Sequence, residues 1–161
     1  FPSTTARTHQ IVSSLIEKGA QPHRIHQNIY DTASFNRLRL LGTALNNLKK
    51  IEGLPVVYIT LSQKELNQNK FKKGDAEGFV NYGLSLQGVL LSVIMIENES
   101  EKIIKMSFRS KGSVDVNQFA RKHFNGGGHI NAAGGKSDTS IEETVSYFIK
   151  SIESEKNIFN A

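Results

Sequence analysis

A run of glycines near the carboxyl-terminal end constrains this chain more than any other segment. Residues 124–135 read FNGGGHINAAGG, so Gly126, Gly127 and Gly128 are consecutive. Consecutive glycines carry a large backbone entropy loss on folding, and they are favoured where the chain needs a positive φ or where another group touches the backbone. We expect a tight turn here, whose backbone N–H groups form a nest for an anion. A turn that only connects a helix to a strand is the open alternative.

Charged and hydroxyl side chains accompany this turn. His129 directly follows the glycines and can donate a hydrogen bond to a phosphate. Arg109 stands at the end of a predicted strand, where a guanidinium can hold a phosphate through two parallel hydrogen bonds, and Ser107 and Ser110 flank it as neutral donors. A solvated arginine is the alternative. One predicted helix separates the two features, and a strand–helix–turn unit of this size can return the chain to the same sheet edge.

A weaker candidate lies at residues 74–81, which read GDAEGFVN. Here Glu77 and Asn81 can present an acid and an amide to a base or a ribose. The alternative is an ordinary helix start, with Asp75 as the N-cap and Phe79 in the core.

The apolar patterns predict an α/β (α+β) fold in which a mixed β-sheet is flanked by helices and preceded by a helical connector. The strands at 88–97 and 102–109 are joined by a short polar link, as in a hairpin. Three helices are expected within residues 1–50. The remaining elements are a strand at 54–61 and helices at 62–69, 76–84, 114–123 and 141–152.

These elements suggest a division of the chain into three parts. Residues 1–50 form a helical connector, residues 51–155 form the sheet domain and residues 156–161 form a frayed tail. The chain begins FPSTT, without an initiator Met or a signal-peptide pattern, so we expect it to be a fragment of a longer protein.

The composition limits which partners, metal sites and catalytic motifs this chain can have. The chain has 161 residues and a net charge of +5, which favours anionic partners. It has no cysteine, which excludes disulfides and thiolate-held metals. No apolar run has the roughly 20 residues of a membrane helix. His23 and His26 lack an accompanying carboxylate cluster, and no HExxH, P-loop or GxSxG motif occurs. We therefore expect no catalytic residues, no metal ligands and no independent hydrolysis in this chain.

Four motifs occur in the order of a known family. They are EGFVN (77–81), SFRS (107–110), VDVNQFA (114–120) and GGGHINAAGG (126–135). This order resembles the DHH-associated domain, the carboxyl-terminal half of DHH-family phosphoesterases, and in particular the bacterial oligoribonuclease/pAp phosphatases, or nanoRNases. The resemblance covers about residues 54–152, and its most specific part is the GGGH-x-x-A-A-G string.

The resemblance implies a division of labour. In that family the amino-terminal DHH half binds two divalent ions, usually manganese, which activate a water, and the carboxyl-terminal half holds the substrate. Carried over by position, Arg109 would grip a phosphate, residues 126–128 would hold the same or a neighbouring phosphate, and His129 would orient it. Asn125 replaces a frequent glycine, and Asn tolerates a positive φ. The secondary candidates are Ser107 and Ser110, followed by Glu77 and Asn81.

The implied function is that of a phosphate-binding domain for nucleotides and very short RNA, with pAp as a further substrate, in a cytoplasmic metal-dependent hydrolase. A cyclic-dinucleotide phosphodiesterase, a non-catalytic nucleic-acid-binding module and a plain interaction domain stay open as alternatives. The implied partners are short oligonucleotides or nucleotides and a DHH domain outside this chain. Whether the protein forms a homo-oligomer stays open.

Overall fold

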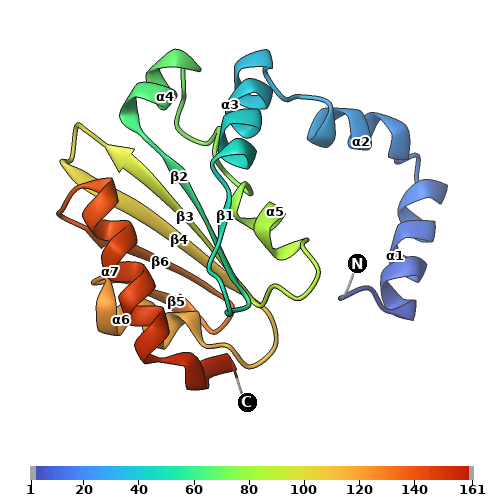
Figure 1. Cartoon of the computed structure of the whole chain (residues 1–161). Helices are drawn as coiled ribbons and strands as arrows, with labels where there is room; N and C mark the ends of the chain where they lie inside the picture. The colour runs from blue at the N-terminus through green and yellow to red at the C-terminus, as the bar shows by residue number, and fades with distance from the viewer. Residues whose placement is uncertain (1–2, 160–161) are drawn as a thin grey trace. The chain divides into compact units, whose positions relative to one another are not determined.

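The computed structural model describes residues 3–159 and contains two units, Phe1–Ser34 and Phe35–Ala161 (Figure 1). The first unit holds two of the predicted helices, α1 (Ala6–Glu17) and α2 (Pro22–Tyr30). Thr5 caps α1 through a reciprocal hydrogen-bond pair with Thr8, and Pro22 opens α2.

The second unit is built on a six-stranded sheet with the strand order β1-β2-β3-β4-β6-β5. Strands β2 and β3 run parallel and the other neighbouring pairs are antiparallel, which confirms the predicted mixed sheet with flanking helices. The strands are β1 (Lys49–Lys50), β2 (Val56–Leu61), β3 (Leu91–Asn98), β4 (Ile103–Ser110), β5 (Gly127–His129) and β6 (Ala132–Ser137). The helices are α3 (Phe35–Asn46), α4 (Gln63–Gln68), α5 (Val80–Leu84), α6 (Val116–His123), α7 (Ile141–Ser154) and the 3-10 helix η1 (Lys156–Phe159).

Each face of the sheet carries a cluster of buried apolar side chains, and the two clusters differ in size. On the α6 face, over which α6 and α7 lie, the larger cluster includes Met106 and Phe108 of β4 together with Phe119, Phe124 and Phe148. On the opposite α5 face, a smaller cluster is covered by α3, α4 and α5, which contact β2 and β3. Strand β4 alternates, so Lys105, Ser107 and Arg109 project to the α5 face. The smaller apolar cluster on this face includes none of these three β4 side chains.

The glycine-rich segment is a β-hairpin rather than a turn between a helix and a strand. Gly127 pairs with Gly134 and His129 with Ala132, and residues 130–131 connect the two strands. The glycines are needed because the backbones meet closely. A Cβ at Gly126 would lie 2.0 Å from the carbonyl oxygen of Gly134.

Two other boundaries differ from the predictions. The helix expected at 76–84 begins only at Val80, because Gly78 has a φ of +83° and breaks the helical path. Asp75 is not its N-cap, since its carboxylate accepts the N–H of Lys72. Of the tail expected to be frayed at 156–161, residues 156–159 form η1, in which Ile158 and Phe159 pack against the larger apolar cluster, and residues 160–161 lie outside the described residues.

Glu155 ties the end of α6 to the end of α7. Its Oε1 accepts a hydrogen bond from Lys122 and lies 2.9 Å from Nε2 of His123. Burial alone would raise the pKa of Glu155, but the hydrogen bonds from these two residues lower it overall. A lowered carboxyl pKa contributes stability above the unfolded-state value, and this contribution disappears as the pH falls through the folded-state value.

Replacing Glu155 by glutamine is expected to lower the free energy of unfolding at pH 7 by about 1 kcal/mol. Denaturant titrations at pH 7 and pH 3 measure this effect, and the difference from the wild type is expected to vanish at pH 3. The exposed Glu153 on the same helix gives the control Glu153→Gln. Equal losses in both variants at pH 7 would contradict the account.

Candidate functional site

Strands β4, β6 and β5 place Arg109 and His129 on one row of the sheet. Arg109 pairs with Ala132, and Ala132 pairs in turn with His129. Directly paired residues project to the same face, and two strand spacings separate the backbones of Arg109 and His129 by about 10 Å. Ala132 is the residue between them in the register. The neighbouring row contains Ser107 and the exposed Gly134. The row therefore has a hydrogen-bond donor at each end and a small residue, Ala132, in the middle.

Helix α5 limits the room beside Arg109. The β3 partner of Arg109 is the fully buried Ser92, whose Oγ donates to the carbonyl oxygen of Val80 at 2.7 Å. Gly83 sits directly on Ser92, since a Cβ there would lie 2.2 Å from Oγ. The half-buried Arg109 donates from Nη1 to the Phe108 carbonyl oxygen at 2.8 Å. This bond uses one of the five guanidinium donors.

The hairpin that carries His129 is anchored at its tip. The Asn131 side-chain amide donates to Ser110 Oγ at 3.0 Å, and the Ser110 N–H donates to the Asn131 carbonyl oxygen at 3.1 Å. The Val116 N–H donates to the Ile130 carbonyl oxygen at 2.8 Å. These bonds fix the tip to the end of β4 and to the start of α6, so the exposed His129 is presented from a fixed backbone.

The three glycines do not form the expected nest. None of residues 126–128 has a positive φ, whereas Asn125 has a φ of +47°, as anticipated for this position. The Gly126 N–H donates to the Ala120 carbonyl oxygen at 3.1 Å, and the Gly128 N–H donates to Asn117 Oδ1 at 2.9 Å. A nest requires adjacent N–H groups that converge on one point. Phosphate binding by these glycines stays a prediction.

Arg121 is a candidate phosphate-binding residue that the sequence analysis missed. Its Nε donates to Asn117 Oδ1 at 2.9 Å, the same oxygen that accepts the Gly128 N–H. A Cβ at Gly127 would lie 3.3 Å from the Arg121 Cζ, so the guanidinium rests against the backbone of β5. The spacing of Asn117 and Arg121, four residues apart on a predicted helix, was the available signal.

The remaining predicted residues lie in three different places. The half-buried Ser107 shares the face of Arg109. Ser110 is buried on the opposite face, where its Oγ donates to the Val114 carbonyl oxygen at 2.6 Å. Glu77 and Asn81 are both exposed near the start of α5. The register thus places Arg109 and His129 on one row and Ser107 on the next, whereas Ser110 is buried on the opposite face of β4.

The metal implied by the resemblance finds no ligand set in this part of the protein. Among residues 3–159, no group of three or more His, Cys, Asp or Glu side chains is placed to hold a metal ion. The same residues include no helix that is both long enough and apolar enough to cross a membrane.

The chain is similar to three proteins named for phosphate chemistry. An exopolyphosphatase-related protein from Bacteroides fragilis has a structure that superposes with a TM-score of 0.93 at 37% identity, over 100% of this chain and 47% of that protein. A 3′,5′-cyclic-nucleotide phosphodiesterase of Helicobacter pylori is 32% identical over 80 residues, which are 45% of this chain and 23% of the relative. A pGpG-specific phosphodiesterase from Vibrio cholerae shares the fold, with a TM-score of 0.58 at 16% identity over 92% of this chain and 51% of that protein.

This chain spans less than half the length of the Bacteroides protein, and its match covers under a quarter of the Helicobacter protein. Residues 53–156 match the family described as the DHHA1 domain. That range contains β2 to β6, the GGGH string and both ends of the row formed by Arg109 and His129. The chain therefore belongs to the DHHA1 domain family, the family of DHH-associated domains that its motifs resemble.

Proposed function

We propose that this chain holds the phosphates of short nucleotides as the substrate-binding domain of a phosphoesterase. One observation carries the proposal: the pairing of β4, β6 and β5 puts Arg109 and His129 at the two ends of one row, with only Ala132 between them. Membership of the DHHA1 family and the phosphodiesterase name of the Helicobacter relative support the same function.

The side chains on this face suit a phosphate. The Arg109 guanidinium can give two parallel N–H bonds to two phosphate oxygens. His129 can donate one ring N–H to the same group from the other side, and the Ser107 hydroxyl adds a neutral donor. The small side chains of Ala132 and Gly134 let the phosphate approach the sheet. The net charge of +5 raises the local concentration of anions.

The proposed substrate is very short RNA, with pAp as a further substrate. Divalent ions, with manganese as the proposed metal, would be bound by a DHH domain outside this chain, where they would activate the attacking water. The role of this chain is to grip and orient the phosphate.

A second candidate is the hydrolysis of a cyclic nucleotide or cyclic dinucleotide. The Helicobacter relative, named as a cyclic-nucleotide phosphodiesterase, favours it. A linear nucleotide with a terminal phosphate offers three free oxygens and a second negative charge there, whereas a cyclic diester offers two free oxygens and one charge, so a bidentate arginine binds the terminal phosphate more strongly. We therefore expect pAp and linear dinucleotides to bind more tightly than cyclic dinucleotides. The reverse order would favour the second candidate.

Arg109→Ala and His129→Ala are each expected to weaken the binding of pAp and of a linear diribonucleotide by 1–3 kcal/mol, or about 5- to 150-fold, the scale of a charged hydrogen bond. Isothermal titration at low salt measures both affinities. Arg39→Ala is the control, because it removes the same charge from an exposed position on α3. Affinities equal to that of the control would contradict the proposal. They would leave a non-catalytic nucleic-acid-binding module or a plain interaction domain as the better account.

A further inference from the structure

A hollow lies on the α5 face, at the other end of β4 from Arg109. Its volume is about 730 Å³. Apolar side chains from three elements line one part of it, namely Leu66 of α4, Phe71 of the following loop and Ile96 of β3. Two cations, Lys73 and Lys105, line another part. An apolar wall beside cations suits a ligand that has both a flat ring and an anionic group.

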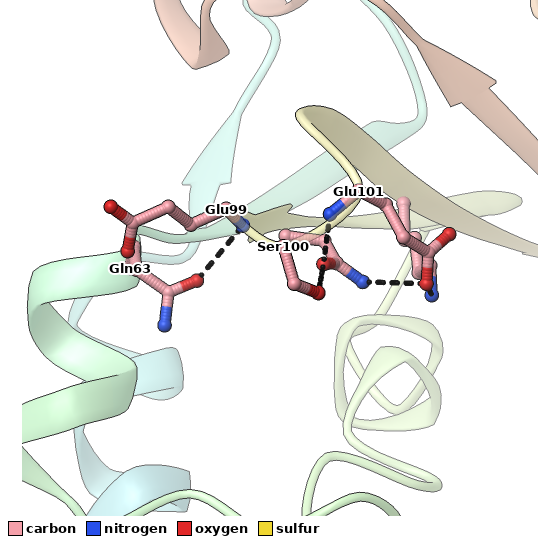
Figure 2. Close-up of polar contacts among 6 residues, drawn as sticks. Gln63, Glu99, Ser100 and Glu101 are labelled. Carbon is pink, nitrogen blue, oxygen red and sulfur yellow. Dashed lines mark hydrogen bonds and ion pairs between the residues drawn. The ribbon is translucent and has the colours of Figure 1, made fainter.

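Polar contacts in the β3–β4 hairpin fix one rim of this hollow (Figure 2). The Gln63 Oε1 accepts the Glu99 N–H at 3.2 Å. The Asn98 Oδ1 accepts the Ser100 hydroxyl at 2.8 Å and the Glu101 N–H at 3.1 Å. These bonds hold the hairpin, and with it this rim of the hollow, in one shape.

The register connects this hollow to the row of Arg109 and His129. Lys105 pairs with Ile96 on one side and with Lys136 on the other. Lys105 and Arg109 are four residues apart on one strand and project to the same face, which separates them by about 13 Å. Between them lies the row of Ser107 and Gly134. The floor between the two positions therefore consists of small residues.

Lys105 and Lys136 face each other across neighbouring strands, an arrangement that like charges disfavour. In this structure Lys105 makes an ion pair with Glu101, which relieves the repulsion. The hydrogen bond from Lys105 also lowers the pKa of Glu101. A phosphate between the two lysines would replace Glu101 as the counter-charge of Lys105 and would also neutralise Lys136.

We propose that this hollow, together with Lys105 and Lys136, binds a second nucleotide unit of a short oligonucleotide. The phosphate lies between the two lysines, and the base lies against Phe71 and Ile96. A single phosphate cannot bridge a span of about 13 Å, so a ligand that fills both positions is a chain of nucleotides. The inference rests on the proposed function and adds to it a preference for oligonucleotides over mononucleotides.

Affinities for pAp and for a tetraribonucleotide, measured on the full 161-residue chain, test this inference. Lys105→Ala and Lys136→Ala are each expected to weaken tetranucleotide binding about fivefold, while pAp binding stays within about twofold of the wild type. Glu101→Gln removes the competing carboxylate and is expected to strengthen tetranucleotide binding about twofold. The exposed Lys150 of α7 gives the control Lys150→Ala.

The lysine variants overturn the inference if they weaken both ligands equally, since the lysines would then act through net charge alone. They also overturn it if neither ligand is affected. Arg109→Ala separates these results from a failure of the proposed function. If Arg109→Ala weakens pAp binding and the lysine variants behave like Lys150→Ala, only the second subsite is wrong. If Arg109→Ala leaves both affinities unchanged, the proposed function fails and the inference fails with it.

Discussion

Gly126→Ala is expected to lower the free energy of unfolding by about 3 kcal/mol. The added Cβ would lie 2.0 Å from the Gly134 carbonyl oxygen and 2.7 Å from the Gly135 Cα. Both atoms belong to the backbone of β6, which is paired with β4, so neither can move without disturbing the sheet. Thermal and denaturant unfolding of the variant measure the loss.

Gly134→Ala is the matched control, because it adds the same methyl group to the same hairpin. Its Cβ would have one neighbour within 4 Å, the Met106 carbonyl oxygen at 3.7 Å, and Gly134 has no positive φ. We expect its stability to equal or slightly exceed that of the wild type, since alanine restricts the unfolded chain. If the two variants were equally stable, close backbone approach would not be the reason for the glycine at position 126.

Phe108→Ala is expected to lower the free energy of unfolding by about 4 kcal/mol. Phe108 is fully buried on the α6 face, with ring centroids of Phe124, Phe119 and Phe148 at 5.6, 6.1 and 6.5 Å. Its removal leaves a cavity among three rigid rings that cannot close around it. Denaturant titration measures the effect, and Phe108→Leu is expected to lose less than half as much.

Phe108 also affects the site, because it stands directly before Arg109 and its carbonyl oxygen accepts the Arg109 Nη1. We expect Phe108→Ala to weaken pAp binding as well, by loosening β4 at this point. If Phe108→Ala were as stable as Phe108→Leu, the aromatic cluster would not determine the stability of the sheet domain.

Much of the fold follows from local patterns. The run at 88–97 is apolar on both faces, and it forms β3, a strand that lies between two others. Thr5, Ser62 and Ser140 each cap a helix through a reciprocal bond with the residue three positions later. The β5–β6 hairpin was not predicted, because its strands are rich in glycine and contain no β-branched residue. Pairing with β4 stabilises them instead of intrinsic propensity.

The candidate site was predictable only in part. Arg109 and His129 were chosen from their neighbouring motifs, and the register shows that they share one row. Ser110 was grouped with Ser107, although side chains alternate along a strand and Ser110 therefore faces the core. Lys136 attracted no attention in the sequence, because its position opposite Lys105 depends on a hairpin that the sequence analysis read as a turn.

The most direct test of the account is an amide NMR titration of this chain with a linear diribonucleotide. The account predicts that shift changes concentrate on Arg109, Ala132 and His129, which form one row of three strands. Ser107 and Gly134 in the neighbouring row should follow. Changes confined to other surfaces, or a spectrum that does not respond at millimolar ligand, would contradict the claim that this row binds the phosphate.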